Sequence, residues 1–410
     1  MPFKLQKTTR FGGNTRISTK LVLLVFVLSL PIAALLYLEF RTRQDEISFA
    51  QSEADGLNYV ADIIPLLRDV QQHRSLAQEV LSGDRTSRDA LAQSTTTVNA
   101  DLARLAERDR QFGRRFGTAT FVAAINEQWP RLRDAGDNDS LDDNFRAHTR
   151  LIEGAILPLL DGVGTRSRLF LDPKMDSRAV ISALMESLPQ VTEGLSEASG
   201  YGVGVLLRRS GQQASDGDKL FVNNQMVLVS GAADAMVRDL EKAMAANPRF
   251  EAALRPLLRR NSVSRENFAT RVNTDIVESR SLVSSATSSF FLLGTSAIDS
   301  SNQLLAGAQT VLNHDFQSRV DEARMAMYWA GGAAFAGLFV ATVLVMLLGR
   351  SITRPVRRLV DVADRMSLGE LDVDIDVTGT NEIGQLAESL RRMQASLRSA
   401  IERLRMRRAA

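Results

Sequence analysis

The chain has 410 residues, no cysteine, and a formal net charge of +2 that results from 50 basic and 48 acidic residues. This near balance argues against a nucleic-acid-binding protein, which needs a basic surplus on one face. The absence of cysteine excludes disulfides, thiolate zinc sites and a cysteine nucleophile. Only 6% aromatic residues and 10 prolines favour an all-α protein over a β-sandwich.

Two apolar segments predict transmembrane helices. Residues 21–38 carry no charge and, at about 1.5 Å per residue, cover roughly 27 Å, which is close to a hydrocarbon core. Residues 325–349 are also uncharged, and we assign the second transmembrane helix to residues 327–349. A buried core helix is the alternative for both segments. A cleaved signal peptide is a further alternative for the first, although no small-x-small site follows Leu38.

Basic residues flank both segments and predict their orientation. The N-terminal tail, residues 1–20, is basic and has no acidic residue, and a cluster of arginines follows Gly349. Because positive flanks stay inside, both termini are expected in the cytoplasm and residues 39–326 outside it, as a periplasmic helical sensor domain. We therefore predict a two-pass protein of a bacterial inner membrane, whose lipid bilayer is a partner.

Residues 350–404 show two helical stripes joined by an extended connector. The first stripe comprises Ile352, Val356, Leu359, Ala363 and Met366. After Gly369, apolar residues alternate with aspartates up to Val377. The second stripe recurs at steps of three and four and comprises Ile383, Leu386, Leu390, Met393, Leu397, Ala400 and Leu404. Two such short stripes cannot bury themselves in one chain, so we expect a parallel four-helix coiled coil in a homodimer.

This region resembles the HAMP domain. The resemblance rests on Pro355, on Gly369-Glu370-Leu371 and on Asn381-Glu382-Ile383-Gly384, where Asn381 replaces the Asp that is common in the family. It implies a dimeric relay that switches between two packings of the bundle, whereas a generic juxtamembrane coiled coil is the alternative. Residues 405–410 form a basic C-terminal tail. The relay residues that we expect are Pro355, Gly369, Leu371, Ile375, Glu382, Ile383, Leu386, Leu390, Met393 and Leu397.

The segment before the second span has helical periodicity throughout. It predicts helices near 40–81, 87–113, 117–134, 141–165, 176–210, 217–246, 250–282 and 286–324. Helices of this number and length suggest two stacked four-helix bundles, arranged in line, with a boundary at Leu171-Asp172-Pro173.

The same segment resembles, more weakly, the extracytoplasmic helical region of bacterial chemoreceptors and sensor histidine kinases. The resemblance rests on the stretch from Pro65 to Arg74 and on Leu171-Asp172-Pro173. It implies that a small ligand binds between helices. An inward-facing arginine would suit a carboxylate, nitrate or phosphate, although such charges also occur on solvated faces. The ligand-binding candidates are His73, Arg74, Arg208 and Arg209, with Gln72 beside them.

The chemistry of catalysis is not indicated. No second histidine follows His73 at helical spacing, so neither a metal nor another cofactor is expected, and no catalytic grouping stands out. All three histidines precede the second span, which leaves none for a kinase phospho-acceptor, and the segment after Gly349 is too short for a chemoreceptor hairpin.

We therefore expect a transmembrane signal-transduction receptor that is not an enzyme. It would sense a periplasmic small-molecule ligand or a periplasmic binding protein and signal to a separate cytoplasmic protein through the HAMP region. The alternatives are a truncated chemoreceptor or histidine kinase without its output domain, and a membrane dimerisation scaffold.

Overall fold

The chain is all-α, as the sequence predicts. The computed structural model describes residues 17–133, 140–208, 211–282 and 287–409, and no strand occurs within these ranges. The α-helices are α1 Ile17–Leu81, α2 Arg88–Phe116, α3 Ala119–Arg133, α4 Leu141–Leu151, α5 Leu157–Arg166, α6 Met175–Ser182, α7 Leu188–Arg208, α8 Asp216–Ala246, α9 Pro248–Val272, α10 Thr287–Leu348, α11 Arg354–Ser367 and α12 Glu382–Ala409. Short 3-10 helices occur at η1 Arg85–Ser87 and η3 Leu169–Leu171.

The chain divides into two compact units. The first, which we call the helical unit, spans Asp45–Ala323. The second combines the residues up to Gln44 with those from Arg324 onward. Because α1 and α10 each contribute to both units, the division falls within these two continuous helices.

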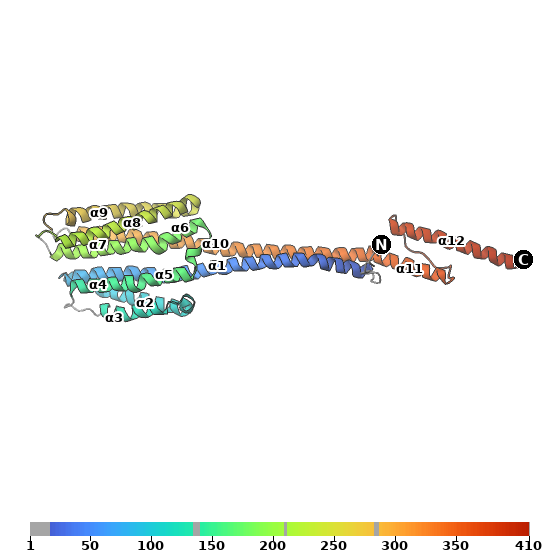
Figure 1. The fold of residues 1–410 in the computed structure, drawn as a ribbon, viewed down its shortest axis with the longest axis horizontal. Helices are drawn as coiled ribbons and strands as arrows, with labels where there is room; N and C mark the ends of the chain where they lie inside the picture. The colour runs from blue at the N-terminus through green and yellow to red at the C-terminus, as the bar shows by residue number, and fades with distance from the viewer. Residues whose placement is uncertain (1–16, 134–139, 209–210, 283–286, 410) are drawn as a thin grey trace, which may run out of the picture. The chain divides into compact units, whose positions relative to one another are not determined.

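The helical unit consists of two groups of helices. The first half contains α1, α2, α3 and the α4–α5 pair, and the second contains the α6–α7 pair, α8, α9 and α10 (Figure 1). The chain passes between them at Leu171-Asp172-Pro173, the boundary that the sequence indicates. Tyr59 of the first half and Phe268 of the second belong to one buried apolar cluster.

The two halves lie side by side along their length, whereas the sequence analysis expected them in line (Figure 1). The reason lies in polar residues on the inner faces of α1 and α7. Gln71 and Arg74 of α1 both donate hydrogen bonds to Glu193 of α7, at 2.7 Å each. Such buried polar groups need partners, so these faces are held against one another.

Local sequence signals explain where several helices begin. Ser215 and Asp218 form a capping box at the start of α8. Asn247 accepts a hydrogen bond from the backbone N–H of Arg249, and Pro248 occupies the first turn of α9, where its missing N–H costs nothing.

Three prolines follow wide π-helical turns. The turns η2 Ile152–Ile156, η4 Ala183–Ser187 and η7 Gly349–Thr353 each end two residues before a proline, at Pro158, Pro189 and Pro355. In η7 the N–H of Arg354 donates to the carbonyl of Gly349, five residues earlier. Since proline lacks the N–H of a regular turn, the helix widens just before it and continues. Pro355 is thus accommodated by a π turn between α10 and α11.

Two helices are long and apolar enough to cross a membrane. They include the N-terminal part of α1 and the C-terminal part of α10, and the most apolar window of each has a mean hydropathy of 2.3. None of the residues in these windows is buried within the chain. A buried core helix, the alternative raised from the sequence, therefore does not describe either segment.

Candidate functional site

The segment after α10 contains a small apolar core around the extended connector that joins α11 to α12. Val373 and Ile375 of the connector pack against the apolar face of α11 and against Ala387 of α12. The contacting face of α11 consists of Leu359, Val362 and Met366. The alternation in the connector therefore sends its apolar side chains inward and its aspartates outward.

Two polar side chains of α12 hold the connector in place. Gln394 donates to the carbonyls of Leu371 and Val373, at 3.0 and 2.7 Å. Arg391 donates to the carbonyls of Ile375 and Val377, at 3.2 and 2.6 Å. An extended segment without a neighbouring strand leaves its carbonyls unpaired, and these side chains supply the donors. Neither residue was predicted from the sequence, although their position beside the apolar seam was a usable signal.

The two helix junctions depend on backbone geometry. Gly369 ends α11 with a φ of 94°, a conformation that favours glycine. Asn381 accepts a hydrogen bond from the N–H of Gly384 at 3.0 Å, so asparagine caps α12 as well as aspartate would. A Cβ at Gly384 would lie 1.9 Å from the carbonyl oxygen of Gly379, which shows how closely the connector approaches the helix. Glu382 is exposed in the first turn of α12, where a carboxylate complements the helix dipole.

The apolar seam of α12 is largely uncovered in the single chain. Leu386, Met393 and Leu397 are 50%, 47% and 42% exposed, whereas Ala387 is fully buried against the connector. Ile383 and Leu390 are half-buried beside that core. The helix therefore uses one face for its own connector and presents the seam outward.

A buried ion-pair network lies at the junction of the two halves of the helical unit. The Arg74 side chain is fully buried and donates to Glu193 at 2.7 Å and Thr149 at 2.8 Å. It also donates to Ser196 at 3.0 Å and lies 3.4 Å from Glu197. Burial raises the pKa of Glu197, and the Arg74 guanidinium opposes that shift. Arg74 thus faces inward, but internal groups already occupy its guanidinium.

A pair of buried histidines lies beside this network. The Nδ1 of His148 lies 2.9 Å from the carbonyl of Asn144, which can only accept, so this nitrogen carries the hydrogen. The free Nε2 of His148 then accepts from Nδ1 of His73, at 2.9 Å. Burial lowers the pKa of His73 to about 4 and that of His148 to about 3, so both rings are neutral near pH 7.

The other ligand candidates occupy different places. Arg208 is partly exposed, donates to the carbonyl of Gly204 at 3.0 Å and lies 3.7 Å from Asp142. Arg209 lies outside the residues that the structure describes. That any of these residues contacts a ligand stays a prediction.

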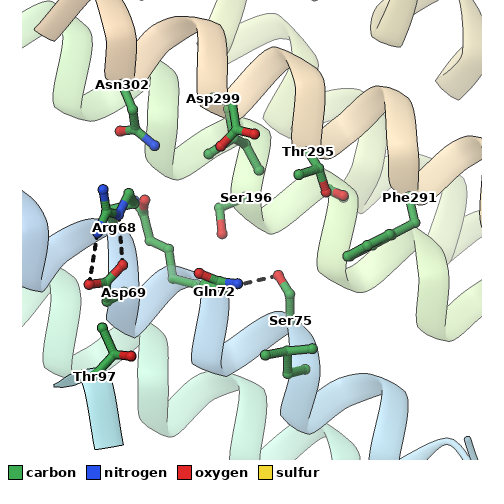
Figure 2. A pocket seen from close by; sticks show the side chains of 14 residues that line it. Arg68, Asp69, Gln72, Ser75, Thr97, Ser196, Phe291, Thr295, Asp299 and Asn302 are labelled. Atoms are coloured by element: carbon green, nitrogen blue, oxygen red, sulfur yellow. Dashed lines mark hydrogen bonds and ion pairs between the residues drawn. The ribbon is translucent and has the colours of Figure 1, made fainter. Parts of the chain in front are cut away.

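A polar groove of about 370 Å³ opens beside the ion-pair network, between α1, α2, α7 and α10 (Figure 2). Gln72, the further candidate, lies at its rim and is exposed. Arg68 and Asp69 of α1 face Asp299 and Asn302 of α10 across it (Figure 2). Burial raises the pKa of Asp299, while the positive charge of Arg68 opposes this effect. This groove could not be predicted from the sequence because its walls come from four separate helices.

Residues 347–399 match the HAMP domain family. The chain carries a HAMP domain. Its boundaries enclose the π turn η7, α11, the connector and most of α12, so the packed core described above is the core of this domain.

Proteins similar to this chain are sensory transducers. A sensory transducer protein of Acetivibrio thermocellus is 39% identical over 64 residues, which are 16% of this chain and 12% of that protein. Methyl-accepting chemotaxis protein TlpB of Bacillus subtilis is 42% identical over 64 residues, 16% of this chain and 10% of that protein. Methyl-accepting chemotaxis protein I of Escherichia coli is 49% identical over 47 residues, which are 12% of this chain and 8% of that protein. The chain thus spans only about a tenth of each relative. No solved structure matches it significantly.

Proposed function

We propose that the chain is a homodimeric receptor of a bacterial inner membrane, with transmembrane helices at residues 21–38 and 327–349 and both termini in the cytoplasm. The helical unit then lies outside the cytoplasm and senses a stimulus. The HAMP domain relays that stimulus to a separate cytoplasmic protein. The observation that carries the proposal is the HAMP match at residues 347–399, directly beyond an apolar helix that continues from the helical unit.

Chain continuity supplies a route for the signal. Helix α10 contributes Asp299 and Asn302 to the polar groove, then runs through its apolar segment to Leu348. The π turn η7 joins it to α11, the first helix of the HAMP domain. A ligand that favours one position of α10 over another would therefore shift the population of HAMP packings.

The exposed seam of α12 supports the dimer. Leu386, Met393 and Leu397 form an apolar stripe on a helix whose adjoining flank is already packed against the connector. Covering such a stripe with that of a second chain removes it from water and is the usual solution for a coiled-coil seam.

A chimera tests the relay. Residues 1–404 are joined to the cytoplasmic part of methyl-accepting chemotaxis protein I of Escherichia coli, and swimming bias is recorded in cells that lack other receptors. Glu382→Lys reverses the charge at the start of α12, so we expect it to change the swimming bias. Glu402→Lys reverses an exposed charge near the end of the same helix and should not. If Glu382→Lys leaves the bias unchanged while the chimera is present in equal amount, the relay function is contradicted and a scaffold is favoured.

A further inference from the structure

The polar groove contains a buried acceptor that has no partner. The Nε2 of Gln71 donates to the Glu193 carboxylate at 2.7 Å, which fixes the orientation of the amide and leaves its Oε1 as the free acceptor. Gln71 is 2% exposed, and its Oε1 makes no hydrogen bond to any residue that the structure describes. A buried acceptor without a partner is costly, so a ligand that offers an N–H or O–H group here gains binding energy.

The charges around the groove disfavour an anion. Asp69 binds the Arg68 guanidinium through both of its oxygens, at 2.6 and 3.0 Å, so the one cation in the groove is already neutralised. Asp299 adds a negative charge near the same guanidinium, and Asp101, whose pKa burial raises to about 7, adds only part of one near neutral pH. Asp299 forms no ion pair within the described ranges of the chain. The groove therefore has an excess of negative charge, in contrast to the carboxylate, nitrate or phosphate site that the arginines of the sequence suggest.

The remaining walls suit a short alkyl chain and a second polar contact. Leu76, Phe291 and Ile298 provide apolar surface, and the face of an aromatic ring attracts a cation. Asn302 of α10 points its buried and unpartnered Nδ2 toward this space, where it would donate to a ligand oxygen or to a water (Figure 2).

We propose that this groove binds a small organic ammonium ion. Asp299 forms an ion pair with the ammonium group, and Gln71 accepts a hydrogen bond from it. Leu76 and Phe291 contact the alkyl part of the ligand. The inference rests on the proposed sensing function and names the chemical class of its ligand. Because Gln71 lies on α1 and Asp299 on α10, such a ligand would bridge the two helices that continue into the apolar segments.

Calorimetric titration of the full chain in lipid nanodiscs tests the proposal. The probes are butylammonium, butyrate and tetramethylammonium, each at the same ionic strength. We expect saturable binding of butylammonium, none of butyrate, and at least about tenfold weaker binding of tetramethylammonium, which has no N–H donor. Binding of butyrate in preference to butylammonium, or equal binding of both ammonium ions, would overturn the proposal.

Variants identify the site. Asp299→Asn should weaken butylammonium binding by about tenfold or more, whereas Asp161→Asn, a substitution of an exposed aspartate on α5, should leave it unchanged. Phe291→Ala removes the ring that contacts the alkyl part of the ligand, so it provides a second variant with weaker butylammonium binding if Asp299→Asn does not fold, as judged by circular dichroism. Equal affinity in folded Asp299→Asn and the parent chain would refute the site. The swimming bias of the chimera is measured without added ligand. A negative result for ammonium binding therefore does not affect the test of the relay.

Discussion

The carboxylate of Glu53 on α1 lies 3.8 Å from the guanidinium of Arg319 on α10, and neither oxygen of Glu53 accepts a hydrogen bond from the described residues. Arg319 pairs more closely with Asp172 at 3.0 Å and with Asp315 at 2.5 Å. Glu53 is thus a third, fully buried carboxyl group beside a cation that is already engaged. Burial, followed by the negative charge of Asp172, raises its pKa to about 8.

Replacing Glu53 should change how stability depends on pH. Between its ordinary pKa of 4.5 and about 8, the unfolded chain ionises this group while the folded chain keeps it protonated, so rising pH favours unfolding. The slope is at most about 1.4 kcal/mol per pH unit. Glu53→Gln should therefore raise the Tm of the full chain in detergent at pH 8 and leave it unchanged at pH 4.5. The exposed Glu127→Gln is the control, and a lower Tm of Glu53→Gln at pH 8 would refute this interpretation.

Removing Arg74 should destabilise the helical unit. Arg74→Ala leaves Glu193 and Glu197 buried without their cation, and breaking a buried ion pair costs about 3–5 kcal/mol. Chemical denaturation of the full chain measures the loss, with the exposed Arg114→Ala as a control expected within about 0.5 kcal/mol of the parent. A loss of similar size in both variants would show that the ion-pair network does not hold the two halves together.

The buried histidines should make the fold sensitive to acid. The unfolded chain takes up protons near the ordinary histidine pKa of 6.5, whereas folded His73 and His148 resist protonation down to about pH 4 and 3. Their contribution to stability is thus complete above pH 6.5 and is lost as the pH falls below it. His148→Gln should flatten the decline of Tm between pH 6.5 and 4. His314→Gln, at an exposed histidine, should not, and an equal decline in His148→Gln would contradict the account.

A methyl group at Gly384 should loosen the HAMP connector. Gly384→Ala places a Cβ 1.9 Å from the carbonyl oxygen of Gly379, so the connector must move. Val373→Cys reports that movement because Val373 is 8% exposed and the chain has no other cysteine. Maleimide labelling at this position should become at least about tenfold faster with Gly384→Ala, which corresponds to about 1.4 kcal/mol of easier opening. Gly349→Ala, where a Cβ meets open space, is the control, and equal labelling in all backgrounds would contradict the packing.

Periodicity in the sequence was sufficient to predict the helices and the HAMP core, because both depend on residues that are close together along the chain. Leu371 and Ile375 alternate with aspartates in the sequence, and Ile375 packs into the HAMP core in the structure. The environment of Arg74 was not predictable in the same way, since its partners lie 119 and 123 residues away on α7. Glu193 and Glu197, spaced by one helical turn in a segment of small and apolar residues, were a signal of buried acids that the sequence analysis did not use.

The side-by-side packing of the two halves escaped prediction for a related reason. Helical stripes show that a helix has a buried face but not which distant helix covers it. The polar groove, whose Gln71, Asp299 and Asn302 come from two helices far apart in sequence, depends on that same choice of neighbours.

Disulfide crosslinking in native membranes tests most directly whether the HAMP seam pairs two chains. Leu386→Cys lies on the exposed seam, whereas Ala395→Cys lies on the opposite face of α12, since each residue advances the helix by about 100°. Because the chain contains no other cysteine, any covalent dimer reports the introduced pair. We predict rapid dimer formation through Leu386→Cys under mild oxidation and little through Ala395→Cys. Absence of a Leu386→Cys dimer, or equal crosslinking at both positions, would contradict the dimeric relay.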